Sequence, residues 1–223
     1  MADPHTVTLL MSEFVTRDVR RFLVSRPPGF TFQAGQGVEL AIKRPEWQDE
    51  HRPFTPSCLA DDKILEFTIK SYPAHKGMTR ELHSLSPEAE LLLPEPFGTI
   101  SYQGPEGGLA GGAGITPFLA IRRERVRAGD IDRRVLIFSN KTPADVICEK
   151  ELRHYLGDRC ILTCTEVQTP GYEYRRLDET SLGETIHDVN QHFYVCGSPG
   201  FMGAVNGALK KLGADPQSLV FER

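Results

Sequence analysis

Two short groups of residues in this chain could hold planar, phosphate-bearing molecules. Residues 52–55 (RPFT) offer a cation for a phosphate, an aromatic face for a planar ring and a hydroxyl for a ring nitrogen. Residues 111–117 (GGAGITP) follow a short apolar stretch and remove side chains where a strand must turn into a helix. Backbone N–H groups can therefore approach a pyrophosphate there. The first group suits a flavin, and the second suits a dinucleotide.

A second phosphate-binding element is expected between these two groups. Ile69 and Lys70 end a predicted strand, and Gly77, Met78 and Thr79 open a predicted helix. The free N–H groups and the dipole of a helix start favour a pyrophosphate. A pyrophosphate belongs to FAD, whereas FMN carries a single phosphate, so this element favours FAD.

The elements that must position the first group are short strands. From residue 6 to about residue 102, β-rich runs alternate with turn residues, which predicts an antiparallel barrel. One helix is expected within it, over residues 79–85. The predicted strands, besides the one that carries residues 52–55, cover residues 6–10, 19–24, 38–42, 64–69 and 90–93.

The pattern of predicted elements changes after residues 103–108 (QGPEGG). These residues have no hydrophobic periodicity and predict a linker. We therefore expect a barrel domain over residues 1–103 and a second domain over residues 104–223. Predicted strands over residues 135–138, 161–164 and 193–196 alternate with helices, two of which are expected over residues 143–156 and 199–211. This alternation predicts a five-stranded parallel sheet. Gly107 and Gly108 fall where a strand should lead into the glycine-rich loop, so that strand is expected to be short or irregular.

The helices of the second domain carry recognisable start signals. A hydroxyl side chain followed by proline, the preferred N-terminal arrangement, occurs at residues 116–117, 142–143 and 198–199. A capping box is expected from Ser181 to Glu184. The positive ends of three helices would then face one sheet edge, where nucleotides bind in open α/β sheets.

The two groups, in this order, resemble the ferredoxin–NADP reductase superfamily, in which a flavin-binding β-barrel precedes a nicotinamide-binding α/β domain. The resemblance covers nearly the whole chain. In the barrel it implies that Arg52 pairs with a flavin phosphate, Phe54 packs on the isoalloxazine and Thr55 hydrogen-bonds flavin N5. Phe54 stands where the family signature has tyrosine. The cofactor-binding residues implied in this half are Arg52, Pro53, Phe54, Thr55, Ile69, Lys70, Gly77, Met78 and Thr79.

The resemblance also assigns roles in the second half. The glycine-rich loop matches the family's Gly-x-Gly-x-Thr-Pro, which lies under the phosphates of the nicotinamide nucleotide. Cys196 would lie beside the nicotinamide C4, and the carboxylate of Glu222 would approach the flavin. Thr55, Cys196 and Glu222 are thus the expected catalytic residues. The implied dinucleotide-binding residues are Gly112, Gly114, Thr116, Pro117, Ser139, Asn140, Lys141, Cys196, Gly197 and Pro199.

The implied activity is hydride transfer from C4 of NAD(P)H to flavin N5, followed by electron transfer to an acceptor such as ferredoxin or flavodoxin. Lys141, with no acidic residue directly at its strand's end, favours NADPH over NADH, and NADH stays open. The alternatives are a reductase component of an oxygenase, a free-flavin reductase, and a non-catalytic flavin-binding subunit or redox sensor. A dehydrogenase without flavin is disfavoured by the barrel-first order and by Pro117.

The composition limits the classes of partner and cofactor that the protein is expected to bind. The 26 Lys and Arg against 30 Asp and Glu give a net charge of −4, which is too weak and too mixed to imply nucleic acid or an anionic membrane. No run approaches the ~20 apolar residues of a membrane span.

Five cysteines without a Cys-x-x-Cys pair favour a reducing cytoplasm and no iron–sulfur cluster. The seven histidines lack ligand-like spacing, so no metal is expected. The arginines at 122–125 are most simply a solvated helix face that could dock an acidic partner.

Overall fold

The computed structural model describes residues 3–72, 74, 76–98, 106–131, 135–214 and 219–221. The chain forms two compact units, Met1–Ser101 with Thr116–Glu124, and Tyr102–Ile115 with Arg125–Arg223. The predicted boundary between residues 103 and 104 lies outside the described residues. The segment Thr116–Glu124 belongs to the first unit, although it follows the glycine-rich loop in the sequence.

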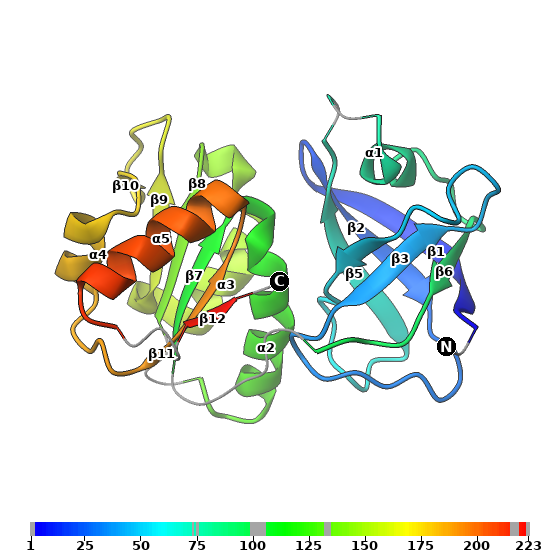
Figure 1. Ribbon diagram of the computed structural model, residues 1–223, viewed down its shortest axis with the longest axis horizontal. Coiled ribbons are helices and arrows are strands. Elements are labelled where there is room, and N and C mark those ends of the chain that lie inside the picture. Colours follow the sequence, from blue (N-terminus) through cyan, green and yellow to red (C-terminus); the bar gives the residue numbers. More distant parts are fainter. Residues whose placement is uncertain are drawn as a thin grey trace. The chain divides into compact units, whose positions relative to one another are not determined.

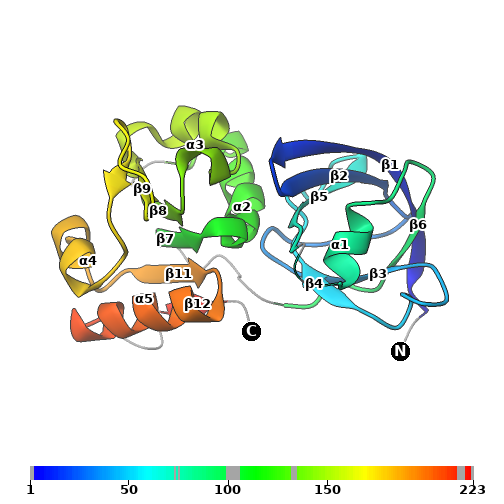
Figure 2. The same cartoon turned by 90° about the horizontal axis from the view of Figure 1, so that it is seen from above.

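The first unit contains a six-stranded antiparallel sheet in the order β4-β3-β6-β1-β2-β5 (Figures 1 and 2). An isolated bridge between Pro56 and Phe67 joins the segment after β4 to β5, so the two edges of the sheet come together. This confirms the antiparallel fold predicted for this half. The strands are β1 (His5–Thr16), β2 (Val19–Ser25), β3 (Val38–Ile42), β4 (Arg52–Phe54), β5 (Ile64–Lys70) and β6 (Glu90–Leu93).

Burial in this sheet follows the two-residue period of a pleated strand. In β5, Leu65, Phe67 and Ile69 are buried and belong to one apolar core. The helix α1 (Met78–Leu82) adds Met78 and Leu82 to the same core. It is shorter than the predicted helix, and it follows β5 in the chain after a loop that ends at Gly77. The strands therefore place residues 52–55 and the start of α1 on one packed scaffold.

The second unit contains a parallel sheet in the order β10-β9-β8-β7-β11-β12, whose strands are labelled in Figure 1. The helices α4 and α5 cover one face, and α3 lies on the other (Figures 1 and 2). The strands are β7 (Glu106–Gly111), β8 (Val135–Asn140), β9 (Cys160–Cys164), β10 (Glu173–Tyr174), β11 (His192–Cys196) and β12 (Leu219–Phe221). The helices of this unit are α3 (Glu149–Leu156), α4 (Glu179–Thr185) and α5 (Pro199–Lys211), with 3₁₀ turns η1 (Gly112–Ile115), η2 (Pro143–Asp145) and η3 (Gly157–Arg159). The helix α2 (Thr116–Arg127) follows η1, and its residues Thr116–Glu124 belong to the first unit.

The parallel sheet confirms the predicted fold class, and three details of the prediction were wrong. The sheet has six strands, because the two-residue β10 adds to one edge. The strand β7 is regular, since it pairs with β8 and β11 along its length, and these neighbours hold its glycines in the ladder. The capping box of α4 runs from Asp178 to Ser181, and not from Ser181 to Glu184 as predicted. Asp178 is the N-cap, and its carboxylate accepts a hydrogen bond from the Ser181 N–H.

Candidate functional site

The parallel sheet reverses its strand order between β7 and β11. From β7 the chain order runs through β8 and β9 to one edge, and through β11 and β12 to the other. In open α/β sheets, ligands bind outside the carboxyl ends of the strands at such a switch point. The carboxyl end of β7 carries the glycine-rich loop, and the carboxyl end of β11 carries residues 196–199. The fold thus brings these two predicted groups to one place.

Gly114 packs directly against the backbone that follows β11. A Cβ atom at this position would lie 2.3 Å from the carbonyl oxygen of Cys196 and 2.6 Å from the amide nitrogen of Gly197. Both atoms are backbone and cannot move aside as a flexible side chain could. Gly112 adopts a φ of +53°, a left-handed conformation that favours glycine. The loop therefore needs these two glycines for its fold as well as for any ligand.

The start of α5 at this sheet edge has the expected cap. The Ser198 hydroxyl accepts a hydrogen bond of 3.3 Å from the Phe201 N–H, and Pro199 is the first residue of α5. The ring of Phe201 packs beside both Gly111 and Gly197, where added Cβ atoms would lie 2.8 and 2.6 Å from ring carbons. The free N–H groups of a helix start can bind an anion. Thr142-Pro143 begins the 3₁₀ turn η2 rather than a long helix.

Two buried polar side chains stand at the ends of the neighbouring strands. Asn140, at the end of β8, is 6% exposed, and its amide oxygen and nitrogen have no hydrogen-bond partner among the described residues. The hydroxyl of Thr163 on β9 is likewise buried without a partner there. Buried polar groups are nearly always hydrogen-bonded, so their capacity is available to a ligand or to water. Asn140 was predicted from the sequence, and Thr163 was missed.

Lys141 forms an ion pair that the sequence did not predict. Its ammonium lies 3.3 Å from the carboxylate of Glu166, and both side chains are exposed. Parallel pairing of Asn140 with Cys164 brings the segments after β8 and β9 together. The sequence contained the signal, because Glu166 follows the next strand by two residues. A carboxylate therefore stands beside the residues expected to meet the adenosine ribose.

Thr55 is the most informative residue of the first unit. It is only 3% exposed, and its hydroxyl has no hydrogen-bond partner within the described part of the chain. Phe54 is half-buried and packs against the core, whereas Pro53 lies exposed in β4. A buried hydroxyl without a partner costs about 1–3 kcal/mol. The residue expected to hydrogen-bond a ring nitrogen thus has a free hydroxyl for that purpose.

The carboxylate of Glu50 lies between two of the groups predicted to bind phosphate. Its Oε1 accepts a hydrogen bond of 2.6 Å from the Arg52 guanidinium and one of 3.4 Å from the Met78 N–H. Met78 itself is buried in the core, so it can offer only its backbone to a ligand. An anion of this chain therefore bridges the cation and the amide that an external phosphate would use. Glu50 was missed in the sequence because its partners come from β4 and α1.

The end of β5 is held by other contacts. The Ile69 side chain is buried, and its carbonyl accepts a 2.9 Å hydrogen bond from Nε2 of His83. Burial lowers the pKa of His83, so the imidazole is neutral at pH 7. The Lys70 ammonium pairs with the Asp18 carboxylate at 3.1 Å. These contacts fix the strand end from which Gly77 and Thr79 follow.

No disulfide joins the cysteines of the described residues. Cys196 is buried at the end of β11, beside Gly114. Burial raises the pKa of the Cys58 thiol to about 11, so it is not a thiolate at neutral pH. Glu222 lies outside the described residues. No cluster of three His, Cys, Asp or Glu side chains that could hold a metal ion occurs in the described ranges.

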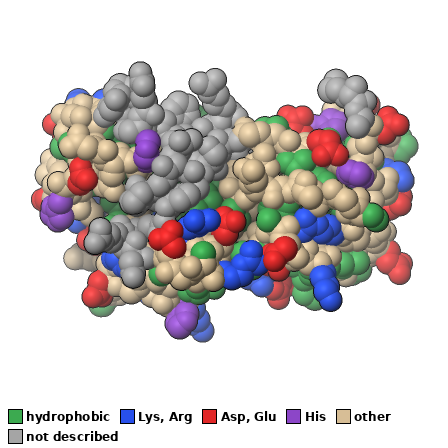
Figure 3. Space-filling model, turned by 90° about the horizontal axis from the view of Figure 1, so that it is seen from below, with side chains coloured by type: hydrophobic (Ala, Val, Ile, Leu, Met, Phe, Trp, Pro, Cys, Tyr) green, Lys and Arg blue, Asp and Glu red, His purple; other side chains and the backbone are tan. Residues whose placement is uncertain are grey.

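The surface charges are of both signs, as the composition predicts. On the face that Figure 3 shows, Lys and Arg side chains are interspersed with Asp and Glu side chains. Among the helices of the described residues, none combines the length and apolar character of a membrane crossing.

The chain is similar to several known reductases. A family model for the oxidoreductase NAD-binding domain matches residues 109–207. The ferredoxin–NAD(P)⁺ reductase component of the naphthalene 1,2-dioxygenase system of Pseudomonas putida is 26% identical, over 95% of this chain and 66% of that protein. NADH-cytochrome b5 reductase 2-A of Vanderwaltozyma polyspora is 30% identical, over 93% of this chain and 75% of that protein.

The fold has close counterparts among solved structures. A ferredoxin NADP⁺ reductase from Neisseria gonorrhoeae with bound FAD and NADP superposes with a TM-score of 0.85, at 19% identity, over 100% of this chain and 99% of that one. At this identity the likeness shows the fold alone. The chain spans 66%, 53% and 53% of the lengths of three of the curated relatives it matches, about half to two thirds of each.

Proposed function

The chain belongs to the ferredoxin–NADP reductase superfamily, and we propose that it is an FAD-dependent NAD(P)H reductase. One observation carries the proposal more than any other. Thr55, which the superfamily signature assigns to the flavin ring, is buried with a hydroxyl that has no partner in the described residues. A flavin nitrogen would satisfy it. The proposed activity is the oxidation of a reduced nicotinamide dinucleotide and the reduction of a separate electron acceptor.

The residues of the first unit fit a flavin. Thr55 holds the ring through its hydroxyl, Phe54 offers an aromatic surface, and Arg52 offers a cation for phosphate. Bound flavin would supply the chemistry, because it accepts a hydride from a nicotinamide and can pass electrons on singly. The protein supplies alignment and electrostatics.

The residues of the second unit fit a dinucleotide. The loop that contains Gly112 and Gly114 would lie against the pyrophosphate, and the start of α5 would add N–H donors. The unsatisfied amide of Asn140 can hydrogen-bond a ribose or adenine edge. Cys196, held beside Gly114, would border the nicotinamide and needs no nucleophilic role.

We further propose that NADH is preferred over NADPH, because Glu166 pairs with Lys141. A carboxylate accepts from a free 2′-hydroxyl and repels a 2′-phosphate. Glu166→Lys is therefore expected to raise the ratio of kcat/KM for NADPH to that for NADH at least about tenfold, since a charge-assisted contact contributes about 1.5–3 kcal/mol. Steady-state kinetics with both dinucleotides measure the ratio.

Asp158→Lys is the matched control for this prediction. It makes the same charge change at an exposed position, but in η3, at the amino end of β9. It should leave the ratio unchanged. An equal shift in both variants would mean that net charge alone sets the preference and that Glu166 has no local role.

Glu50→Gln is expected to tighten FAD binding by up to about fivefold. The substitution removes the carboxylate that competes with phosphate for Arg52 and the Met78 amide. The effect is modest because exposed ion pairs contribute only about 0–1 kcal/mol. Fluorescence titration of the apoprotein with FAD measures the dissociation constant. Glu46→Gln, at an exposed position, is the control, and weaker binding by Glu50→Gln would contradict the prediction.

We propose a redox protein as the acceptor, which agrees with the ferredoxin and cytochrome b5 in the names of the similar proteins. A reductase component of an oxygenase is the second candidate, because the Pseudomonas relative is one.

An anaerobic absorbance titration with NADH and with NADPH tests the function directly. A yellow protein that loses its colour with either dinucleotide is expected. A protein that binds no flavin, or whose flavin stays oxidised, would refute the reductase.

A further inference from the structure

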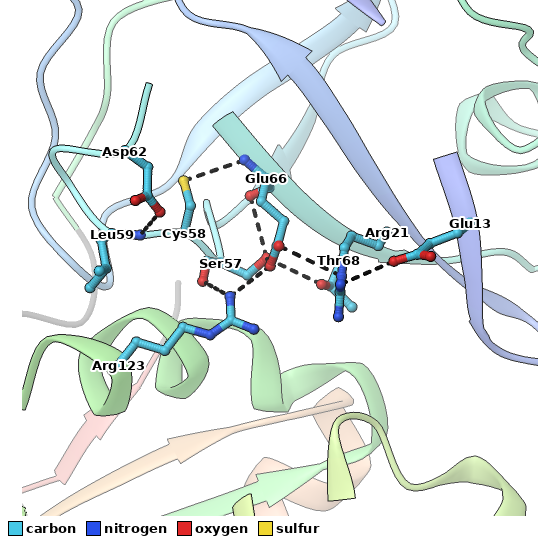
Figure 4. Close-up of polar contacts among 9 residues, drawn as sticks. All are labelled: Glu13, Arg21, Ser57, Cys58, Leu59, Asp62, Glu66, Thr68 and Arg123. Atoms are coloured by element: carbon cyan, nitrogen blue, oxygen red, sulfur yellow. Dashed lines mark hydrogen bonds and ion pairs between the residues drawn. The ribbon is translucent and has the colours of Figure 1, made fainter. Parts of the chain in front are cut away.

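Arg123 of α2 is held by two acceptors on the barrel (Figure 4). Its Nη1 donates to the carbonyl oxygen of Ser57 at 2.6 Å and to Oε1 of Glu66 at 2.7 Å. The side chains of Arg123 and Glu66 are only 16% and 14% exposed. All three residues belong to the first unit. The expectation of a solvated arginine face at residues 122–125 was wrong here, and Arg122 is buried as well.

Glu66 is the centre of this cluster. Besides its bond with Arg123, the Glu66 carboxylate accepts a hydrogen bond of 2.8 Å from the Ser57 hydroxyl. It also lies 3.6 Å from Nε of Arg21. Arg21 in turn donates to Glu13 at 3.0 Å. Charge-assisted hydrogen bonds in a water-poor setting are stronger and more directional than exposed ones. We call Arg123, Ser57 and Glu66 the Arg123 clamp.

The clamp fixes the segment that carries Thr55. The Ser57 N–H donates to the Glu66 carbonyl at 2.8 Å, and the Ser57 carbonyl accepts from Arg123, so both backbone groups are bound. The Ser57 hydroxyl also lies 3.1 Å from that of Thr68. Ser57 is fully buried, and Pro56 bridges to β5. Thr55, two residues earlier, has the free hydroxyl.

We propose that Arg123 is a positioning residue, which sets the place of the Thr55 hydroxyl by holding the backbone of Ser57. The inference rests on the proposed function, since it gives the hydroxyl a flavin to meet. Positioning matters because a displacement of about 1 Å can cost about a hundredfold in rate. The arginine acts through the chain and touches no cofactor in this proposal.

The test compares Arg123→Gln, Arg123→Lys and Glu66→Gln in the flavin-loaded protein. Stopped-flow reduction by NADH should slow at least about tenfold in Arg123→Gln, with the KM for NADH changed less than twofold. The visible absorption band of the flavin should shift, because its hydrogen bond from Thr55 changes. Arg123→Lys keeps the charge and should recover part of both effects. Arg127→Gln, exposed on the same helix, should match the wild type.

Amide hydrogen exchange of the flavin-free protein gives an independent reading. Exchange at Ser57 should accelerate in Arg123→Gln and Glu66→Gln but not in Arg127→Gln. If Arg123→Gln does not fold, faster exchange at Ser57 can be measured in Glu66→Gln, which keeps the shape of the side chain. An unchanged rate and spectrum in the clamp variants would overturn the inference. A wild-type protein that neither NADH nor NADPH reduces would instead refute the proposed function.

Discussion

Replacing Gly114 with alanine is expected to lower the free energy of unfolding by about 2–3 kcal/mol and to abolish dinucleotide binding. The added Cβ would lie 2.3 Å from the carbonyl oxygen and 2.4 Å from the carbonyl carbon of Cys196. Neither atom belongs to a flexible side chain, so the loop and the end of β11 must separate. That separation displaces the turn whose N–H groups would meet the pyrophosphate.

Urea denaturation and NADH titration measure the two effects of Gly114→Ala. Gly203→Ala is the matched control, because Gly203 lies within α5 and an added Cβ there meets no atom within 4 Å. The control should be stabilised by up to about 1 kcal/mol, since alanine is the better helix former. If Gly114→Ala bound NADH like the wild type, the close packing of the loop on Cys196 would not be needed for binding.

This contrast shows what the sequence could and could not predict. The glycine-rich loop was predicted from local signals, because a strand, a glycine run and a Thr-Pro helix start follow one another in the chain. The need for glycine at 114 depends on Cys196 and Gly197, at the end of β11 and directly after it, more than eighty residues along the chain. The local pattern identified the loop, and only the parallel pairing of β7 and β11 identifies what the loop packs against.

The same reasoning explains the other residues that were missed. Glu166 depends on the pairing of β8 with β9, and Glu50 depends on the meeting of β4 with α1. Arg123 looked solvated because charged residues surround it in the sequence. Tertiary contacts gave it two buried acceptors. A single sequence shows residue type and periodicity, while the partner of a charged side chain depends on topology.

Element bounds were predictable where the local signals were strong. The helix over 199–211 was predicted to the residue, because Ser198 and Pro199 mark its start and the apolar period runs through it. The predicted helix over 143–156 is divided into η2 and α3. Cys148, between them, has a φ of +53°, a left-handed value that interrupts a helix. Nothing in the local residue types signals that break.

Replacing Thr55 with valine is expected to have opposite effects on stability and on catalysis. Valine has nearly the shape of threonine but lacks the hydroxyl, which is buried with no partner in the described residues. Removing an unsatisfied buried polar group should raise the free energy of unfolding of the flavin-free protein by about 1 kcal/mol. The flavin-loaded protein would lose a hydrogen bond to the ring, so reduction by NADH should slow about tenfold or more.

Thr68→Val supplies the comparison, because it is the same substitution at another buried threonine of the same unit. The Thr68 hydroxyl lies 3.1 Å from that of Ser57, so its loss should destabilise the flavin-free protein by about 1 kcal/mol. Thermal unfolding without flavin and stopped-flow reduction with flavin separate the two effects. A destabilised Thr55→Val would mean that the Thr55 hydroxyl is already satisfied without a ligand. It would then have no capacity left for a flavin nitrogen, and the strongest support for flavin binding would be lost.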